Sequence, residues 1–261
     1  MSVSSDPAIN VQALFDLTGR TALVTGASRG IGAVAAATLD AAGARVILCG
    51  RDAVRLRELA GSLTNDPVVL TADLAAPDGI RDLLSSARAA VDHVDVLINN
   101  AGMHAPGPAI SLDADDWDRI QAVNLRSAFL LCRGIAPAMA AVGWGKIVNI
   151  SSVLGLVGDI EAAPYAASKA GLIGLTRALA AEWAASGVGV NALCPGWIET
   201  EMVKGLRANE AFDRRVRRRT PVGRWGRPAD LSGSLLFLAS PASDFMAGQT
   251  LVVDGGLTAS W

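Results

Sequence analysis

Residues 21–32 read TALVTGASRGIG, which joins a short apolar stretch to a run of glycines. Residues 21–25 are β-branched or apolar, as in a buried strand, and an Ala-rich helical pattern follows over 31–42. Glycines in such a turn let the backbone approach a pyrophosphate, and the N-terminus of the next helix favours the phosphate charge. The stretch therefore predicts a dinucleotide-binding strand, turn and helix. A tight turn without a ligand is the alternative for an isolated match.

The alternation of apolar strands and helices continues along the chain. Further strands are expected over 45–49, 68–72, 94–98, 146–150, 188–193 and 250–253, and further helices over 53–63, 77–91, 117–141 and 165–186. Strands that are apolar throughout and separated by helices indicate a parallel sheet covered on both faces. We therefore predict the α/β class, with a single-domain, Rossmann-type doubly wound parallel sheet and helices on both faces.

Two segments lie outside this alternation. Residues 1–13 begin MSVSSDPAIN, which has neither the basic nor the apolar region of a signal peptide, and are expected to form a disordered or extended tail. Residues 14–261 are expected to form one dinucleotide-binding catalytic domain. Within it, residues 199–230 interrupt the alternation and are the candidate for a segment that covers the substrate.

Composition excludes several classes of protein. With 261 residues, 51% of them hydrophobic, the chain is neither a disordered polypeptide nor a disulfide scaffold. The net charge of −2 gives no electrostatic reason to expect nucleic acid or an anionic membrane as a partner. No stretch reaches the roughly 18 apolar residues of a membrane span. We expect a soluble, cytoplasmic protein.

The cysteines and histidines do not form a metal-site pattern. Cys49, Cys132 and Cys194 are far apart, and His93 and His104 are the only histidines. Neither a zinc site nor a disulfide framework is indicated, so we expect no bound metal and three buried free thiols in a reducing compartment.

Tyr165 and Lys169 are four residues apart in the helical stretch YAASKAGLIGLTRALAAEW, which places both side chains on one face. A nearby ammonium favours the phenolate, so Lys169 is expected to lower the pKa of Tyr165 and make it an acid or base. An ordinary helix-face contact is the alternative for this pair alone. Tyr165 is also the one tyrosine in the chain.

Several motifs in order make the chain resemble the short-chain dehydrogenase/reductase family over about residues 14–258. They are TGASRGIG at 25–32, NNAG at 99–102 and PG at 195–196, together with Ser152 placed 13 residues before Tyr165. The resemblance implies that Tyr165 transfers a proton, Ser152 polarises the substrate oxygen and Lys169 supports Tyr165 and the nicotinamide ribose. It also implies that Asn124 holds a water near Lys169. Ser151 is the alternative serine if the preceding strand ends one residue earlier.

The end of the second expected strand bears on the choice of cofactor. It reads Cys49-Gly50-Arg51-Asp52, with Gly50 where an acidic side chain would select NAD. Arg51 and Arg29 together suit a ribose 2′-phosphate, and we predict NADP(H). A surface pair of Arg51 with Asp52 is the alternative. The cofactor-binding residues that follow from the glycine turn and the resemblance are Gly26, Ser28, Arg29, Gly30, Ile31, Gly32, Arg51, Asp73, Leu74, Asn100, Ala101, Gly102, Tyr165, Lys169, Pro195, Gly196, Ile198 and Thr200.

Substrate contacts are expected after the fourth and fifth strands and after PG. The expected pocket residues are His104, Leu154, Ile160, Trp197 and Met202. Asp159 and Glu161 are expected at a solvated loop edge, with binding of sugar hydroxyls as the alternative. The arginines over 214–219 are expected to form a solvated helix face, with a phosphate or carrier-protein group as the alternative.

These observations and the resemblance predict an NADP(H)-dependent oxidoreductase that interconverts a ketone and a secondary alcohol. A carbonyl reductase or an alcohol, sugar or polyol dehydrogenase would fit. A 3-oxoacyl-(acyl-carrier-protein) reductase is the alternative activity; a non-catalytic dinucleotide sensor or scaffold and a methyltransferase are alternatives of other classes. The resemblance also implies a homotetramer in which the helices bearing Asn124 and Tyr165 pair between subunits.

Overall fold

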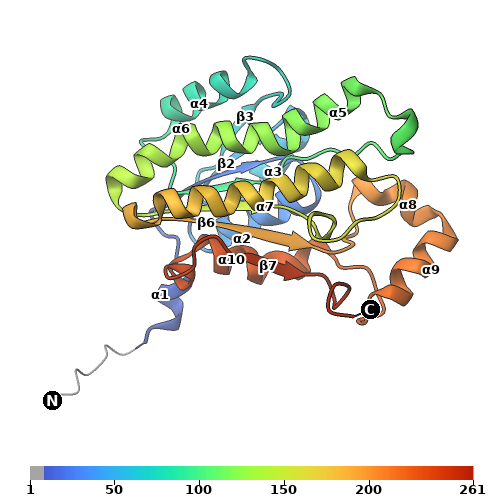
Figure 1. Cartoon of the computed structure of the whole chain (residues 1–261). Coiled ribbons are helices and arrows are strands. Elements are labelled where there is room, and N and C mark those ends of the chain that lie inside the picture. The colour runs from blue at the N-terminus through green and yellow to red at the C-terminus, as the bar shows by residue number, and fades with distance from the viewer. Residues whose placement is uncertain (1–8, 261) are drawn as a thin grey trace.

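Seven parallel strands form one sheet at the centre of the computed structural model, which describes residues 9–260 (Figure 1). Their order across the sheet is β3-β2-β1-β4-β5-β6-β7. The strands are β1 (Thr21–Thr25), β2 (Arg45–Gly50), β3 (Val68–Thr71), β4 (Val96–Asn99), β5 (Gly145–Ile150), β6 (Val188–Pro195) and β7 (Thr250–Val253).

Helices cover both faces of the sheet, because successive strand residues point to opposite sides. On one face, the core joins strand residues such as Val24 to α2 (Gly30–Ala41), α3 (Ala53–Ala60) and α10 (Ser232–Ala239). On the other, it joins residues such as Leu23 to α4 (Gly79–Ala90), α6 (Ser127–Val142) and α7 (Ala163–Trp183). The predicted doubly wound, single-domain α/β fold is confirmed.

The strand order reverses between β1 and β4. The chain builds outward from β1 to β2 and β3, and then crosses to the other side of β1 to begin β4. Such a switch leaves a crevice at the carboxyl ends of the two strands, where ligands bind in open α/β sheets. The glycine turn after β1 and the NNAG segment after β4 therefore meet at one place.

The expected helix over 117–141 is an interrupted helix in the structure. It consists of α5 (Ala114–Gln121), a π-helical turn η2 (Ala122–Arg126) and α6. Contrary to the sequence-based expectation, Ala114–Val142 is long and apolar enough to span a membrane by length and composition. Buried residues of α6 such as Leu131 and Met139 nevertheless belong to the core against the sheet, and core helices of globular proteins often meet this criterion.

The N-terminal prediction is partly wrong. Residues 11–13 belong to α1 (Val11–Phe15), whose first turn is capped by Asn10, whereas residues 1–8 lie outside the described part of the chain.

Residues 199–230 form short helices. These are η5 (Glu201–Val203), α8 (Lys204–Ala208), α9 (Glu210–Arg219) and the beginning of η6 (Pro228–Leu231). The remaining short helical turns are η1 (Ala109–Ser111), η3 (Val153–Gly155), η4 (Ala184–Ser186) and η7 (Pro241–Ser243).

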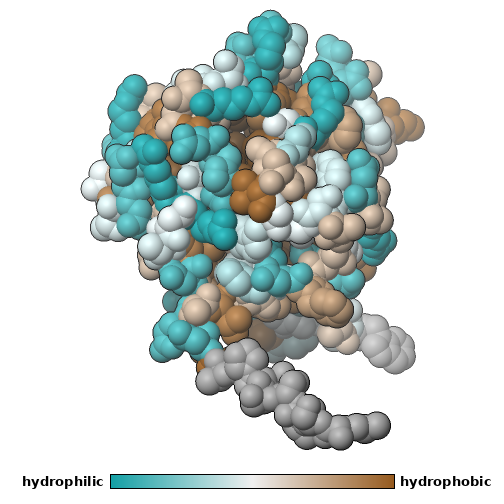
Figure 2. All heavy atoms as spheres, turned by 90° about the vertical axis from the view of Figure 1, so that its left-hand side faces the viewer, coloured by the Kyte–Doolittle hydropathy of each residue, from teal (hydrophilic) through white to brown (hydrophobic). Residues whose placement is uncertain are grey.

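Cys49, Cys132 and Cys194 are buried free thiols, as expected. Over residues 9–260, no group of three His, Cys, Asp or Glu side chains is placed to hold a metal ion. Figure 2 shows the surface that lies at the left of Figure 1, where hydrophilic residues are spread among smaller hydrophobic areas.

Candidate active site

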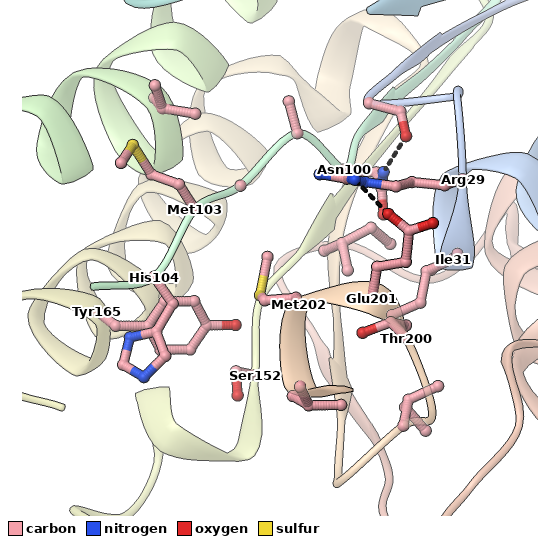
Figure 3. A pocket seen from close by; sticks show the side chains of 18 of the residues that line it. Arg29, Ile31, Asn100, Met103, His104, Ser152, Tyr165, Thr200, Glu201 and Met202 are labelled. Atoms are coloured by element: carbon pink, nitrogen blue, oxygen red, sulfur yellow. Dashed lines mark hydrogen bonds and ion pairs between the residues drawn. The ribbon is translucent and has the colours of Figure 1, made fainter. Parts of the chain in front are cut away.

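A cavity of about 540 Å³ lies at the carboxyl ends of the central strands. Its wall runs from the glycine turn through Asn100 to Ser152, Tyr165 and Lys169. Except for Gly32 and Asn124, which are buried behind the wall, the nucleotide-binding and catalytic residues expected from separate motifs line one cavity, part of which is shown in Figure 3.

The glycine turn requires its glycines for close packing. Gly26 has φ +65°, and a Cβ there would lie 2.9 Å from Nδ2 of Asn100. A Cβ on Gly32 would lie 2.2 Å from the carbonyl oxygen of Gly26. Gly32 is buried and does not belong to the cavity wall, so it supports the turn by packing and not by the direct contact that the sequence suggested.

Asn100 joins this turn to the segment after β4. Its Nδ2 donates to the carbonyl oxygens of Thr25 and Gly26 at 2.9 and 3.2 Å. In return, Oγ1 of Thr25 accepts from the backbone N–H groups of Asn100 and Ala101 at 3.0 and 3.1 Å. Thr25, the first residue of the TGASRGIG motif, thus fixes the two loops relative to each other, a role not expected from the sequence.

Tyr165 and Lys169 enter the cavity from α7, and Ser152 enters from the end of β5. Figure 3 shows the Tyr165 ring beside His104, with Ser152 close to its hydroxyl end. Nζ of Lys169 donates to the carbonyl oxygen of Ile150 at 2.7 Å. The hydroxyl of Ser151 instead donates to the carbonyl oxygen of Lys169 at 2.8 Å, so the geometry favours Ser152 for contact with a substrate.

The net shift in the pKa of Tyr165 is opposite to the lowering that Lys169 alone was expected to cause. Burial raises the pKa of Tyr165 to about 12, although the Ser152 hydroxyl acts in the opposite direction. Burial also lowers the pKa of Lys169 to about 8. Nζ of Lys169 lies 5.6 Å from the centre of the Tyr165 ring and bonds to the backbone, so desolvation dominates. Tyr165 is therefore a protonated phenol at neutral pH.

Asn124 lies in the π-helical turn and is buried. Its Oδ1 accepts from the N–H of Met103 at 2.8 Å, and its Nδ2 donates to the Met103 carbonyl oxygen and the Ser168 hydroxyl, both at 3.0 Å. These bonds hold the segment after NNAG against α7. The expectation that Asn124 also holds a water near Lys169 stays a prediction.

The far end of the cavity is rich in arginine. Arg29, Arg51 and Arg55 all line it. Asp52 caps α3 and pairs with Arg55 at 3.4 Å, so the alternative pairing of Arg51 with Asp52 is not what the structure contains. Other expected nucleotide-binding residues also belong to the wall: Ser28, Gly30, Ile31, Asp73, Leu74, Ala101, Gly102, Pro195, Gly196, Ile198 and Thr200.

This wall fits a dinucleotide with phosphate groups. The turn brings backbone amides and a helix N-terminus to the middle of the cavity, and guanidinium groups stand at one end. At the other end, Gly102 lies beside Lys169, whose Nζ would be 3.5 Å from a Cβ at Gly102.

Four of the five expected substrate-pocket residues line the cavity: His104, Leu154, Trp197 and Met202. Ile160 does not, and its 75% exposure places it at the surface. Asp159 was expected at a solvated loop edge, but its side chain is 17% exposed and pairs with Arg215 of α9 at 3.0 Å.

Comparison with known proteins agrees with this geometry. Residues 26–258 match the protein-family model described as Enoyl-(Acyl carrier protein) reductase. The chain is also 41% identical to 2-dehydro-3-deoxy-D-gluconate 5-dehydrogenase of Escherichia coli K12 over 246 residues, which are 93% of this chain and 96% of the relative. The chain belongs to the short-chain dehydrogenase/reductase family. It is an oxidoreductase that acts on CH–OH and C=O groups.

Two further members of the short-chain dehydrogenase/reductase family show the range of relatives. The crystal structure of a gluconate 5-dehydrogenase from Burkholderia cenocepacia in complex with NADP and tartrate is 38% identical, with a TM-score of 0.91 over 97% of this chain and 100% of that one. A 3-oxoacyl-(acyl-carrier-protein) reductase FabG from Rickettsia prowazekii is 37% identical over 94% of this chain and 99% of its own length.

In this short-chain dehydrogenase/reductase, residues 199–230 contribute directly to the cavity wall. Trp197, just before the segment, packs edge-on against Phe212 and Trp225, with ring centres 5.1 and 5.7 Å apart, and so ties α9 to the wall. Arg214 and Arg217 form i,i+4 pairs with Glu210 and Asp213, as expected of a solvated helix face.

Several wall residues were not expected individually from the sequence. They include Arg55, Met103, Arg119 and Val123, and also Glu201, Val203 and Leu206 of the segment that was expected to cover the substrate. Val123 precedes Asn124, and Met103 follows NNAG, so proximity to a motif was their only sequence signal.

Proposed function

We propose that the protein is an NADP(H)-dependent dehydrogenase of polyhydroxy acids, which interconverts a secondary alcohol of a sugar acid and the corresponding ketone. The names of the relatives from Escherichia coli and Burkholderia cenocepacia support an aldonic acid such as gluconate. The observation that carries the proposal is the state of His104 beside Tyr165.

His104 offers an unsatisfied hydrogen-bonding group to a substrate. Its ring centre lies 4.9 Å from that of Tyr165, and its buried Nδ1 has no hydrogen-bond partner among the residues that the structure describes. Burial lowers the pKa of His104, so the imidazole is neutral at pH 7 and can donate or accept. A buried polar atom without a partner is costly. A hydroxyl next to the reacting carbon would satisfy it, whereas the methylene group next to the ketone of a 3-oxoacyl chain would not.

The cofactor is NADP(H), as the sequence predicts. Arg29 and Arg51 both line the nucleotide end of the cavity, and guanidinium groups suit a 2′-phosphate. The similar structure from Burkholderia cenocepacia holds NADP. A bound nicotinamide cofactor supplies hydride chemistry at the reacting carbon.

The protein's own residues handle the proton. Tyr165, protonated at neutral pH, donates its phenolic proton to the ketone oxygen when the carbonyl carbon is reduced. In the reverse direction it takes the proton back from the alcohol. The Ser152 hydroxyl lies near the Tyr165 hydroxyl (Figure 3). From this position it would donate a hydrogen bond to the same substrate oxygen and polarise it. Lys169, with a pKa of about 8, carries a positive charge at pH 7 that stabilises developing negative charge on Tyr165.

We further propose that the enzyme is located in the cytoplasm and that residues 199–230 cover the substrate. We also propose a homotetramer in which the interrupted helix that bears Asn124 (α5, η2 and α6) and α7, which bears Tyr165, pair between subunits. Phe129 of α6 is 39% exposed and available for such a contact.

A substrate panel tests the proposal. Initial rates would be measured with gluconate and NADP+, with 5-dehydrogluconate and NADPH, and with an acetoacetyl thioester and NADPH. We expect kcat/KM for the keto sugar acid to exceed that for the thioester by at least about tenfold. The reverse ratio would favour the second candidate, a 3-oxoacyl-(acyl-carrier-protein) reductase, which the apolar wall at Leu154, Trp197 and Met202 would accommodate. NADPH binding without turnover of any substrate would indicate a sensor or scaffold.

A further inference from the structure

Glu201 joins three distant parts of the chain at the nucleotide end of the cavity. It begins η5, and its carboxylate pairs with the guanidinium of Arg29 in the glycine turn. It also accepts from Nη1 of Arg55 on α3 at 2.9 and 3.1 Å. All three residues line the cavity, and Figure 3 shows Glu201 directed toward Arg29.

The charges at this site are unequally matched. Two guanidinium groups share the Glu201 carboxylate, and Asp52 reaches only Arg55, at 3.4 Å. The Arg29, Glu201 and Arg55 side chains are 57%, 47% and 42% exposed, so water and salt screen the pairs. A phosphate monoester carries more negative charge than a carboxylate and accepts the same forked hydrogen bonds from arginine. The carboxylate is therefore a partner that a phosphate can replace.

The third basic group has no such partner. Arg51 lines the same end of the cavity, and no carboxylate pairs with it within residues 9–260. A nucleotide phosphate arriving here would meet Arg51 directly, whereas Arg29 and Arg55 must first release Glu201.

We propose that Arg55 is a further phosphate-binding residue for NADP(H), and that Glu201 competes with the 2′-phosphate for Arg29 and Arg55. Glu201 thereby weakens the binding of NADP(H) and reduces the preference of the protein for NADP(H) over NAD(H). The inference rests on the proposed function only for the identity of the cofactor, and it does not depend on the substrate.

Binding of two nucleotide fragments tests the proposal without any turnover. Adenosine 2′,5′-bisphosphate carries the 2′-phosphate, and 5′-AMP lacks it. Calorimetric titration would compare the wild type with Glu201→Gln. We expect Glu201→Gln to bind the bisphosphate about three- to tenfold more tightly, the range for losing two exposed ion pairs as competitors. Affinity for 5′-AMP should change by less than about twofold, because 5′-AMP has no 2′-phosphate.

Glu199→Gln is the matched control. Glu199 lies two residues away, pairs with Arg207 at 2.9 Å and does not line the cavity. The substitution removes the same charge from the same segment, so a general charge effect would tighten binding in both variants. Tightening confined to Glu201→Gln supports direct competition.

Arg55→Met tests the other half of the proposal. Methionine keeps much of the volume of the arginine side chain, and we expect this substitution to weaken bisphosphate binding about fivefold. In the double variant, Glu201→Gln should raise the affinity for the bisphosphate by less than it does in the wild-type background. Unchanged or weaker bisphosphate binding in Glu201→Gln would overturn the competition, and an Arg55→Met variant equal to the wild type would overturn the role of Arg55. If the wild type binds the bisphosphate no more tightly than 5′-AMP, the NADP(H) assignment itself fails. Failure to oxidise sugar acids would leave these binding results unaffected.

Discussion

Nζ of Lys169 donates a hydrogen bond to the carbonyl oxygen of Ile150 at 2.7 Å, which ties the catalytic face of α7 to the end of β5. The Lys169 side chain is buried, and burial lowers its pKa to about 8 from the value of 10.5 for a solvated lysine. Its ammonium therefore destabilises the fold at neutral pH while serving the active site.

Lys169→Met should make the folded protein more stable at pH 7 and inactive. Because the folded-state pKa is the lower one, the unfolded chain binds more protons between about pH 8 and 10.5, and wild-type stability rises with pH in that window. The full cost of the charge is present below pH 8. We expect a gain in the free energy of unfolding of roughly 1–3 kcal/mol at pH 7 that shrinks at pH 10. Urea unfolding at both pH values measures this difference in the free energy of unfolding. A variant less stable than the wild type at pH 7 would contradict the claim that the buried charge of Lys169 costs stability.

Tyr165 should titrate far above the range of a solvated phenol. It is the one tyrosine in the chain, so phenolate absorbance reports on this group alone. Burial raises its pKa to about 12, and we expect an alkaline titration of the folded protein to approach that value. The same titration of Tyr165→Phe gives the background change in absorbance. A midpoint below 10 would show that Lys169 dominates over burial.

His104→Leu should separate polyhydroxy from simple substrates. Removing the imidazole deletes a hydrogen bond to a substrate hydroxyl, so kcat/KM for the keto sugar acid should fall about tenfold or more. The rate with a simple ketone should change little, because it has no hydroxyl to lose. His104→Gln, which keeps a polar group, should retain part of the activity. Equal losses for both substrates would point to a structural role beside Tyr165.

Gly32→Ala should disrupt the nucleotide turn, because the new Cβ would lie 2.2 Å from the Gly26 carbonyl oxygen. We expect a loss of roughly 2 kcal/mol in stability and weaker NADPH binding. Gly233→Ala is the control within α10, where a Cβ meets nothing within 4 Å, and it should be neutral or stabilising. Thermal unfolding and NADPH titration would measure the stability and the NADPH affinity of both variants. Equal changes in the two variants would argue against the packing role of Gly32.

The sequence predicted the elements whose signals are local. Apolar strands and spaced motifs predicted the doubly wound sheet and placed Ser152, Tyr165 and Lys169 in one cavity. It could not predict the pairing of Glu201 with Arg29, because 172 residues separate them and only the fold brings them together.

Other differences follow from properties that no local pattern carries. The raised pKa of Tyr165 depends on the burial contributed by many segments, which outweighs the one neighbour visible at helical spacing. Ile160 reads as a pocket residue by its apolar character, but the loop conformation turns it to the surface. The π-helical turn that positions Asn124 interrupts a stretch whose periodicity indicates one continuous helix.

The most direct test of the proposed mechanism is the rate of NADPH oxidation with 5-dehydrogluconate in the wild type and in Tyr165→Phe. We predict measurable turnover in the wild type and a loss of about 10²–10⁴-fold in kcat in the variant, the usual contribution of a general acid. The Kd for NADPH should stay within about threefold, because the substitution removes one hydroxyl at the substrate end of the cavity. A Tyr165→Phe enzyme that retains kcat within about tenfold of the wild type would contradict the assignment of Tyr165 as the proton donor.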